Sequence, residues 1–301
     1  MDVIALDVVA PTVTGAIQGC VYGLLGLGLV LLYKSNRVFN FAQAEFGTSA
    51  AFATSFAFNG TGFLPKMPIG FAVIFGLLVG VGIGLAVERA VVRPLFNAPK
   101  VTLVVATAGV ALLLISLQGF FAGAEPGSFP ALRIGDVYNE GAVRITWQGV
   151  FIVFVLAVLA ASAALFFSRT RTGTAIIAVS QEPTATSLVG ISVKRTSALT
   201  WGLAGLLGAV AGILLSGQNG ILAPGVLTGL ALIPAFTAAV FGGITSLPGA
   251  FLGGVVIGVL EALAATNIPG DIIPGSGRVV LFVALLAVLL FRPAGLLGKE
   301  T

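Results

Sequence analysis

The chain alternates long apolar runs with short loops that carry most of its charged residues. Most runs have roughly the 17 to 25 residues that a helix needs to cross a bilayer. Apolar residues are continuous within each run, whereas a strand of a membrane barrel would alternate apolar and polar residues. Because lipid offers the backbone no hydrogen bonds, these runs are predicted to be helices. They lie near residues 8–33, 42–58, 68–87, 101–122, 146–167, 198–215, 228–241, 250–265 and 278–291.

This pattern predicts an all-α polytopic membrane protein in which residues 1–301 form a single transmembrane domain. The run at 228–241 is short and contains Pro234, so it is expected to be a broken or re-entrant helix. The bundle is therefore expected to contain eight or nine transmembrane helices, with one short or broken segment.

The amino-acid composition excludes most of the chemistry carried out by soluble enzymes. Of the 301 residues, 57% are hydrophobic and 9% are charged, and the mean hydropathy is +1.11. Soluble domains carry roughly 25% charged residues. The single cysteine, Cys20, excludes an intramolecular disulfide. The lack of histidine excludes histidine general-base catalysis and His-ligated metal sites.

The sequence also lacks a phosphate-binding loop. The only Gly-Lys pair, Gly298 and Lys299, is followed by Glu300 and does not fit the P-loop pattern. We therefore expect no catalytic residue, no metal and no cofactor in this chain. The small positive excess is too thinly spread to indicate a nucleic-acid partner. Energy for any transport would have to come from a partner or an ion gradient.

Most basic residues fall on one side of the membrane if every run crosses it. By the positive-inside rule this side is cytoplasmic, which places the N-terminus outside. These residues are Lys34, Arg37, Arg89, Arg93, Lys100, Arg169, Arg171, Lys194, Arg195, Arg292 and Lys299.

Glycines recur at a spacing of four within several runs. Small residues at this spacing share one helix face and let the backbones of two helices approach closely. Tight helix packing is therefore the expected role of these residues. The sets are Gly15, Gly19 and Gly23; Gly76, Gly80 and Gly84; and Gly254 and Gly258.

The stretch N-F-A-Q-A-E, from Asn40 to Glu45, stands at the start of the second apolar run. An Asn followed three residues later by Gln is a variant of the capping box, so Asn40 and Gln43 could simply cap this helix. The alternative is a transport pathway formed by Asn40, Gln43 and Glu45. Ionisable residues at membrane depth are rare and mostly functional, which favours this role for Glu45. Glu45 and Glu261 are also the two carboxylates that would suit an ion-coupled carrier.

The longest charged stretch expected on the cytoplasmic side is 168–197. Gly173, Pro183 and Gly190 divide it into two short amphipathic pieces, which predicts a surface loop with helical content. Its basic residues either only enforce topology or form a docking platform for a soluble cytoplasmic protein.

Four stretches together give the chain a specific resemblance over almost its whole length. They are RVFNFAQAEFG (37–47), ERAVVRPL (88–95), GISVKRTSALT (190–200) and FTAAVFGGITSLPGAFLGGVVIGVLEAL (236–263). Through them the chain resembles the LivH-type permease subunits of bacterial branched-chain amino acid ABC importers. It departs from that family at Gln43 and Ala44, where a His-Gly pair is usual, and at Gln181 and Glu182, where an acidic pair is usual.

The resemblance implies a non-catalytic, multi-pass permease in the bacterial cytoplasmic (inner) membrane that moves branched-chain or related amino acids. It implies as partners a second, LivM-type permease, two cytoplasmic ATPases that bind ATP and Mg, an extracytoplasmic solute-binding protein, and membrane lipid. It makes 168–197 the cytoplasmic coupling loop. The implied coupling residues are Arg171, Gly173, Gln181, Glu182, Gly190 and Ile191.

Two alternatives remain open at this point. A permease for urea or short-chain amides would have a closely similar sequence. An ion-coupled carrier or channel, a different class, would rely on Glu45 and Glu261. Whether the permease pairs with itself or with a different subunit is also open.

Overall fold

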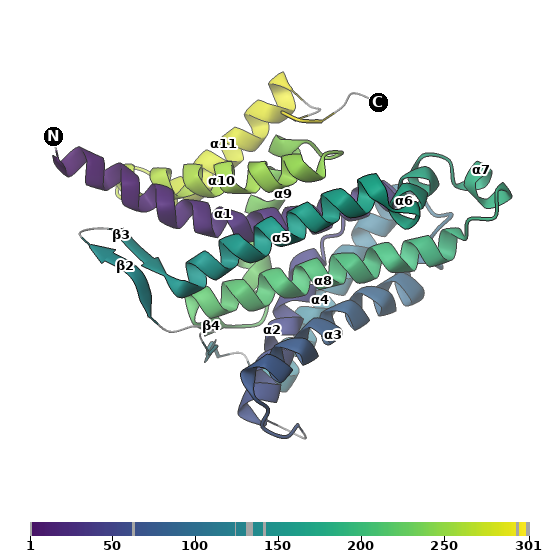
Figure 1. Cartoon of the computed structure of the whole chain (residues 1–301), viewed down its shortest axis with the longest axis horizontal. Helices are drawn as coiled ribbons and strands as arrows, with labels where there is room; N and C mark the ends of the chain where they lie inside the picture. The colour runs from purple at the N-terminus through teal and green to yellow at the C-terminus, as the bar shows by residue number, and fades with distance from the viewer. Residues whose placement is uncertain are drawn as a thin grey trace.

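The computed structural model describes residues 2–61, 64–123, 125–130, 135–140, 143–292 and 295–298. These residues form one helical bundle (Figure 1). The helices are α1 (Asp2–Asn36), α2 (Gln43–Asn59), α3 (Ile69–Val87), α4 (Lys100–Ala122), α5 (Trp147–Arg169), α6 (Arg171–Gln181), α7 (Pro183–Leu188), α8 (Val193–Asn219), α9 (Ile233–Gly242), α10 (Leu247–Asn267) and α11 (Ser276–Phe291). Two π-helices, η1 (Glu88–Val92) and η2 (Thr228–Leu232), follow α3 and precede α9.

Two pairs of short antiparallel strands join the helices. β1 (Gly127–Ser128) pairs with β4 (Ile221–Leu222), and β2 (Asp136–Glu140) pairs with β3 (Val143–Thr146) in a hairpin before α5. The sequence analysis expected helices only, because strands this short leave no period-2 pattern in the sequence.

The prediction of a mainly helical membrane protein is confirmed. Within the described residues, six helices are long and apolar enough to cross a membrane: Val8–Asn36, Ile69–Val92, Lys100–Ala122, Trp147–Arg169, Val193–Asn219 and Leu247–Asn267. The segments Thr228–Gly242 and Ser276–Phe291 are apolar but shorter. The number of eight or nine spans therefore stays a prediction.

The segment that contains Pro234 is short and irregular, whereas its expected broken or re-entrant path through the membrane stays a prediction. The segment Thr228–Gly242 starts with the π-helix η2, and Pro234 lies at the start of the α-helix α9 that follows it. A proline has no N–H to donate and clashes with the carbonyl one turn earlier, so a regular helix cannot continue through it. Before η2 the chain turns through Gly225, whose φ of 72° is one that glycine adopts without strain.

α1 occupies the interior of the bundle. Within its most apolar window, 83% of the residues are buried, and its most extensive packing is against α10. It also packs against α5, α8 and α9. The exposed apolar surface belongs instead to helices such as α3 and α5, whose corresponding windows are only 22% and 11% buried.

Glycines bring the backbones of α1 and α10 into direct contact. A Cβ atom added to Gly15 would lie 2.6 Å from the carbonyl oxygen of Gly258, and one added to Gly19 would collide with the carbonyl oxygen of Gly254. These pairs run in opposite directions along the two helices, so α1 and α10 are antiparallel. The predicted packing role of the glycines is confirmed here, and no larger residue fits these positions without displacing backbone.

The second glycine set joins α3 to its neighbours. A Cβ on Gly76 would lie 2.6 Å from the carbonyl oxygen of Ala50 in α2, and one on Gly80 would lie 3.0 Å from that of Gly205 in α8. α3 is thus held against both helices by one small-residue face, while its other face is exposed.

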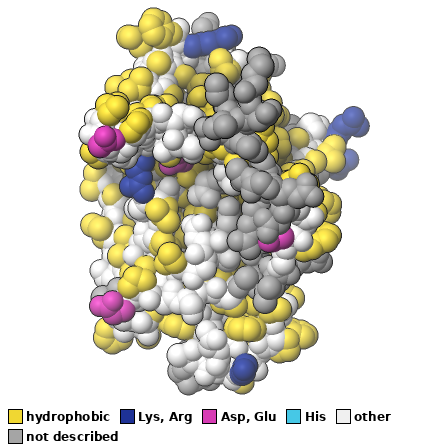
Figure 2. Space-filling view, turned by 90° about the vertical axis from the view of Figure 1, so that its left-hand side faces the viewer, with side chains coloured by type: hydrophobic (Ala, Val, Ile, Leu, Met, Phe, Trp, Pro, Cys, Tyr) yellow, Lys and Arg dark blue, Asp and Glu magenta, His cyan; other side chains and the backbone are white. Residues whose placement is uncertain are grey.

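The two ends of the bundle differ in charge. Lys34, Lys100 and Lys194 lie at the end where α6 and α7 project (right in Figure 1), and we call this the basic end. The opposite end carries the start of α1 and the β2–β3 hairpin, and Figure 2, which faces it, shows only scattered charged side chains among hydrophobic ones. Lys299, expected on the basic side, lies outside the described residues.

We expect the variant Gly254→Val to lose folded protein, because its side chain would meet backbone atoms of Gly19 and Gly23. Overpacking of this kind costs about 1 to 3 kcal/mol of folding free energy or more. The measurement is the melting temperature and monodisperse fraction in detergent. Gly82→Val in α3 is the matched control, since a Cβ at Gly82 meets nothing within 4 Å. Equal behaviour of the two variants would contradict the packing role.

Candidate functional site

The polar stretch predicted at the second run lies inside the bundle. Asn40, Gln43 and Glu45 are 1%, 0% and 0% exposed. The start of α2 is enclosed by neighbouring helices: Gln43 packs against Gly28 of α1 and Gly208 of α8. The N-terminal end of a helix, with its unsatisfied N–H groups and positive dipole, is thus buried together with a carboxyl group.

Asn40 and Gln43 use their polar atoms to hold this helix start in place. The Oδ1 atom of Asn40 accepts a hydrogen bond from the backbone N–H of Ala42 (3.0 Å), and its Nδ2 donates to Oε1 of Gln43 (3.3 Å). Gln43 Nε2 in turn donates to the carbonyl oxygen of Ala204 in α8 (2.8 Å). Gln43 therefore ties α2 to α8 instead of closing a capping box.

Glu45 belongs to a separate cluster that the sequence analysis missed. Gln118 Nε2, from α4, donates to Oε2 of Glu45 and to Oγ of Ser49, both at 2.9 Å. The Oε1 atom of Gln118 accepts from the backbone N–H of Gly225 (3.1 Å). One buried amide thereby joins α2, α4 and the turn before η2. The sequence could have indicated this cluster through Gln118 itself, because a single amide within an apolar run is costly in lipid unless it has a hydrogen-bond partner.

One oxygen of the Glu45 carboxyl remains available. Its Oε1 atom and the Oγ1 atom of Thr228 are buried and have no hydrogen-bond partner by distance and angle within the described part of the chain. Thr228, which begins η2, approaches the Glu45 carboxyl with its hydroxyl and its backbone N–H, and the hydroxyl of Thr48 in α2 also lies close to it. A buried carboxyl oxygen without a donor is costly, so this atom would gain most from an additional N–H or O–H group.

Glu261, the second carboxylate considered for ion coupling, lies in a different cluster. It is half-buried in α10 and interacts with Tyr22 of α1 and Arg278 of α11. A cavity of about 310 Å³ opens beside it, lined also by Ser276. No group of three or more Cys, Asp or Glu side chains that could hold a metal is found among the described residues.

The stretch 168–197 consists of the end of α5, the helices α6 and α7, and the start of α8. Gly173 is buried in α6, where a Cβ atom would collide with the carbonyl oxygen of Phe166. Gly190 follows α7 with φ of 86°, a left-handed conformation that favours glycine. The exposed residues among the predicted coupling set are Arg171, Gln181, Glu182 and Gly190, whereas Ile191 is half-buried.

Two apolar side chains at the tip of this segment were not predicted. Leu188 is 84% exposed and Val189 is 74% exposed, at the end of α7. Adjacent exposed apolar residues at a projecting tip are typical of a protein contact. The sequence T-S-L-V-G contains this apolar pair, but an apolar pair inside an amphipathic piece is equally consistent with a buried helix face.

The segment 168–197 lies opposite η1, the π-helix that follows α3, across a cavity. Arg93 donates two hydrogen bonds to the buried carboxylate of Glu88, from Nε (3.3 Å) and from an η nitrogen (2.9 Å). A cavity of about 390 Å³ separates this ion pair from α7 and the start of α8, and Pro183 and Lys194 line its other side. A bidentate, largely desolvated pair of this kind fixes the local geometry more than an exposed one does.

Comparisons with known proteins agree over most of the chain. The family described as "Branched-chain amino acid transport system / permease component" matches residues 12–290. The permease protein BraD of Pseudomonas aeruginosa, from a high-affinity branched-chain amino acid transport system, is 34% identical over 95% of this chain and 94% of its own length. LivH of Escherichia coli, from a system of the same description, is 30% identical over the same shares. A chain of PsaBC from Streptococcus pneumoniae matches 94% of this chain and 91% of its own length with a TM-score of 0.48 and 16% identity, a similarity too low to support a conclusion about function.

Proposed function

The chain belongs to the permease family of branched-chain amino acid transport systems, and we propose that it is the membrane-spanning subunit of an importer that moves branched-chain or related amino acids. The observation that carries this proposal is the match to BraD and LivH over 95% of the chain. The importer would use ATP hydrolysed by other chains, since this sequence contains no phosphate-binding loop. Neither the urea and amide alternative nor the ion-coupled carrier gains support from the family match.

The proposed assembly follows from the two ends of the bundle. The basic end would face the cytoplasm in the bacterial inner membrane and receive two ATPase subunits that bind ATP and Mg. The opposite end would face the solute-binding protein. A second permease, either related or identical, would complete the membrane part beside one of the apolar outer faces, with lipid around the remainder.

The tip of α7 is proposed as the contact with the ATPase. Leu188 and Val189 supply exposed apolar surface there, and the exposed Glu182, directly before α7, supplies charge, while Arg171 is exposed at the start of α6. Behind the tip, α6 packs against α1, α5 and α8. A shift of α6 on ATP binding would therefore reach the central helix α1 directly, and the glycine contacts would pass it on to α10 as a rigid unit.

Glu45 is proposed as the residue that meets the substrate along the path. Its unpartnered Oε1 atom suits the ammonium group of an amino acid, and Gln118 keeps the carboxyl in place. Asn40 and Gln43 are proposed to act indirectly, because their polar atoms already hold the start of α2. Selectivity for the side chain would rest mainly with the solute-binding protein.

The proposed function predicts ATP-dependent uptake only in the complete system. Proteoliposomes with this chain, its ATPases and its companion permease should take up leucine, isoleucine or valine when supplied with the binding protein and ATP. This chain alone should show no ATP turnover above empty liposomes. Uptake of urea but of no amino acid, or ATP turnover by this chain alone, would contradict the proposal.

We expect Leu188→Asp to lower copurification of the ATPase, and the uptake that depends on it, by about tenfold. The substitution places a charge where the bound ATPase would bury an apolar side chain. The same substitution at Val137, an exposed apolar residue of the β2–β3 hairpin at the opposite end, is the matched control and should leave copurification unchanged. Copurification is measured by affinity pull-down of this chain. If both variants retain the ATPase fully, α7 is not the contact.

We expect Glu45→Gln to lower uptake per assembled complex by about tenfold or more, since a hydrogen bond to a charged group is worth about 1.5 to 3 kcal/mol. Asn40→Ala should instead lower the amount of assembled complex, through a loss of about 0.5 to 2 kcal/mol of helix stability, and leave uptake per complex near wild type. Both quantities are measured on the same proteoliposome preparations. Wild-type uptake per complex for Glu45→Gln would refute the pathway role.

A further inference from the structure

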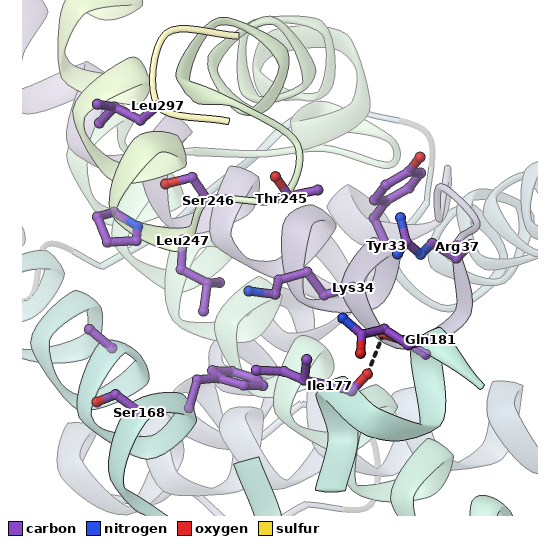
Figure 3. Close-up of a pocket in the computed structure, with 14 residues that line it drawn as sticks. Tyr33, Lys34, Arg37, Ser168, Ile177, Gln181, Thr245, Ser246, Leu247 and Leu297 are labelled. Atoms are coloured by element: carbon purple, nitrogen blue, oxygen red, sulfur yellow. Dashed lines mark hydrogen bonds between the residues drawn. The ribbon is translucent and has the colours of Figure 1, made fainter. Parts of the chain in front are cut away.

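A cavity of about 610 Å³ lies at the basic end, among segments that are far apart in the sequence. Its walls come from the end of α1, the end of α5, the helix α6 and the turn between α9 and α10. In Figure 3, Lys34 points into the space between Leu247 and Ile177, while Arg37 and Tyr33 stand at one side. The volume is in the range of small-ligand sites, about 300 to 1,000 Å³.

The charge in this cavity is entirely positive. Lys34 and Arg37 are its ionisable cations, and no Asp or Glu is found among the described residues that line it. The one ion pair in the described part of the chain joins Arg93 and Glu88, so neither cation has a carboxylate partner. The ammonium of Lys34 lies 5.8 Å from the ring centre of Phe167, a cation–π contact that leaves its hydrogen-bond donors free.

A helix end adds to this positive character. Ser246 lines the cavity and caps α10, accepting a hydrogen bond from the backbone N–H of Gly249 at 3.0 Å. The positive end of the α10 dipole is therefore directed to the side of the cavity that faces Lys34. Two cations and a helix N-terminus around one cavity favour an anion.

The backbone at Arg37 supports a role for its side chain. Arg37 has φ of 53°, and among the described residues it is the one non-glycine residue with positive φ. Its N–H bonds to the carbonyl oxygen of Tyr33 (2.9 Å) and so ends α1 in the left-handed conformation that is usually taken by glycine. An arginine at this position costs about 1 kcal/mol relative to glycine, which points to a use for the guanidinium group.

The remaining lining combines apolar side chains with the neutral polar Ser168, Ser180, Gln181, Thr245 and Ser246. Phe167, Ile177, Leu247 and Leu297 line the space beside the cations. The cavity is formed where α1, α5 and α10 have an end, and α1, α5 and α10 each contain a segment long enough to span a membrane. If these helices span a bilayer, their ends lie near the lipid headgroups, and basic pockets between membrane helices on the cytoplasmic side can bind anionic headgroups.

We propose that this cavity binds the headgroup of one anionic phospholipid from the leaflet at the basic end. The phosphate lies between Lys34 and Arg37, and the glycerol and upper acyl carbons follow the wall formed by Phe167 and Leu247. Gln181 of α6 lines the same cavity, so the bound lipid touches the segment proposed to couple to the ATPase. The lipid would brace α1, α5, α6 and α10 against one another at this end.

The test is native mass spectrometry of the purified full chain titrated with phosphatidylglycerol or phosphatidylcholine. We expect wild type to retain one phosphatidylglycerol in preference to phosphatidylcholine. The double variant Lys34→Gln, Arg37→Gln should bind phosphatidylglycerol at least about tenfold more weakly, since each cation near an anionic lipid contributes about 1 kcal/mol. Ala164→Phe, which fills the cavity and keeps both charges, should weaken binding as well.

Arg169→Gln is the matched control, because Arg169 is an exposed cation at the end of α5 that does not line the cavity; it should bind like wild type. Melting temperatures of all variants establish that they are folded. Wild-type affinity in the double variant, or equal retention of the two lipids, overturns the proposal. Full displacement of phosphatidylglycerol by millimolar inorganic phosphate also overturns it, because the cavity would then be a site for soluble phosphate. Lipid retention is measured without transport, so this result is independent of the proposed function.

Discussion

The backbone contact between α1 and α10 is the constraint on which the arrangement of the bundle depends. In lipid, apolar side chains gain little by leaving their surroundings, so helices associate through close van der Waals contact. Gly15 and Gly19 of α1 meet Gly258 and Gly254 of α10 so closely that a single added carbon would collide with backbone. α1 can therefore occupy the centre, and α5, α8 and α9 pack around this pair. Because this antiparallel pair runs from one end of the bundle to the other, a displacement at one end would be transmitted to the other.

Within this frame, polar groups are placed where another helix can satisfy them. Gln43 reaches a carbonyl oxygen of α8, and Gln118 connects Glu45 with the turn that precedes η2. In a membrane each of these groups would otherwise cost several kcal/mol. The start of α2 is therefore both a structural junction and the place in this network where a carboxyl oxygen forms no hydrogen bond, although the hydroxyls of Thr48 and Thr228 lie nearby. That combination is what makes a buried glutamate suitable for meeting a cationic group.

The basic end brings together the features on which the proposed ATPase coupling rests. The projecting tip of α7 offers apolar contact surface, and the Glu88–Arg93 pair supports the turn behind it. The cavity around Lys34 joins α6 to the ends of α1 and α10. α7 packs against α6, and α6 packs against α1, so a displacement of the tip would reach the central helix pair through α6. An anionic lipid in that cavity would set how stiffly the two are joined.

The sequence by itself determined the helices. Continuous apolar runs of bilayer length are a local property, so the predicted runs at 101–122 and 250–265 lie within α4 and α10 as the structure has them. The glycine faces were also predictable, because a spacing of four places residues on one side of any helix. The stretch from Asn40 to Glu45 was correctly located at the start of a helix.

Only the tertiary structure decided which helices meet. Gln118 pairs with Glu45 across 73 positions, and the α9–α10 turn closes the cavity beside Lys34. The membrane helices are apolar on all faces, so their periodicity does not indicate which face meets which neighbour. The same uniformity concealed the burial of the α2 start, whereas Leu188 lies in an amphipathic piece whose apolar residues could equally have been buried. Such features depend on the directions in which distant segments pack, and no local pattern in the chain records those directions.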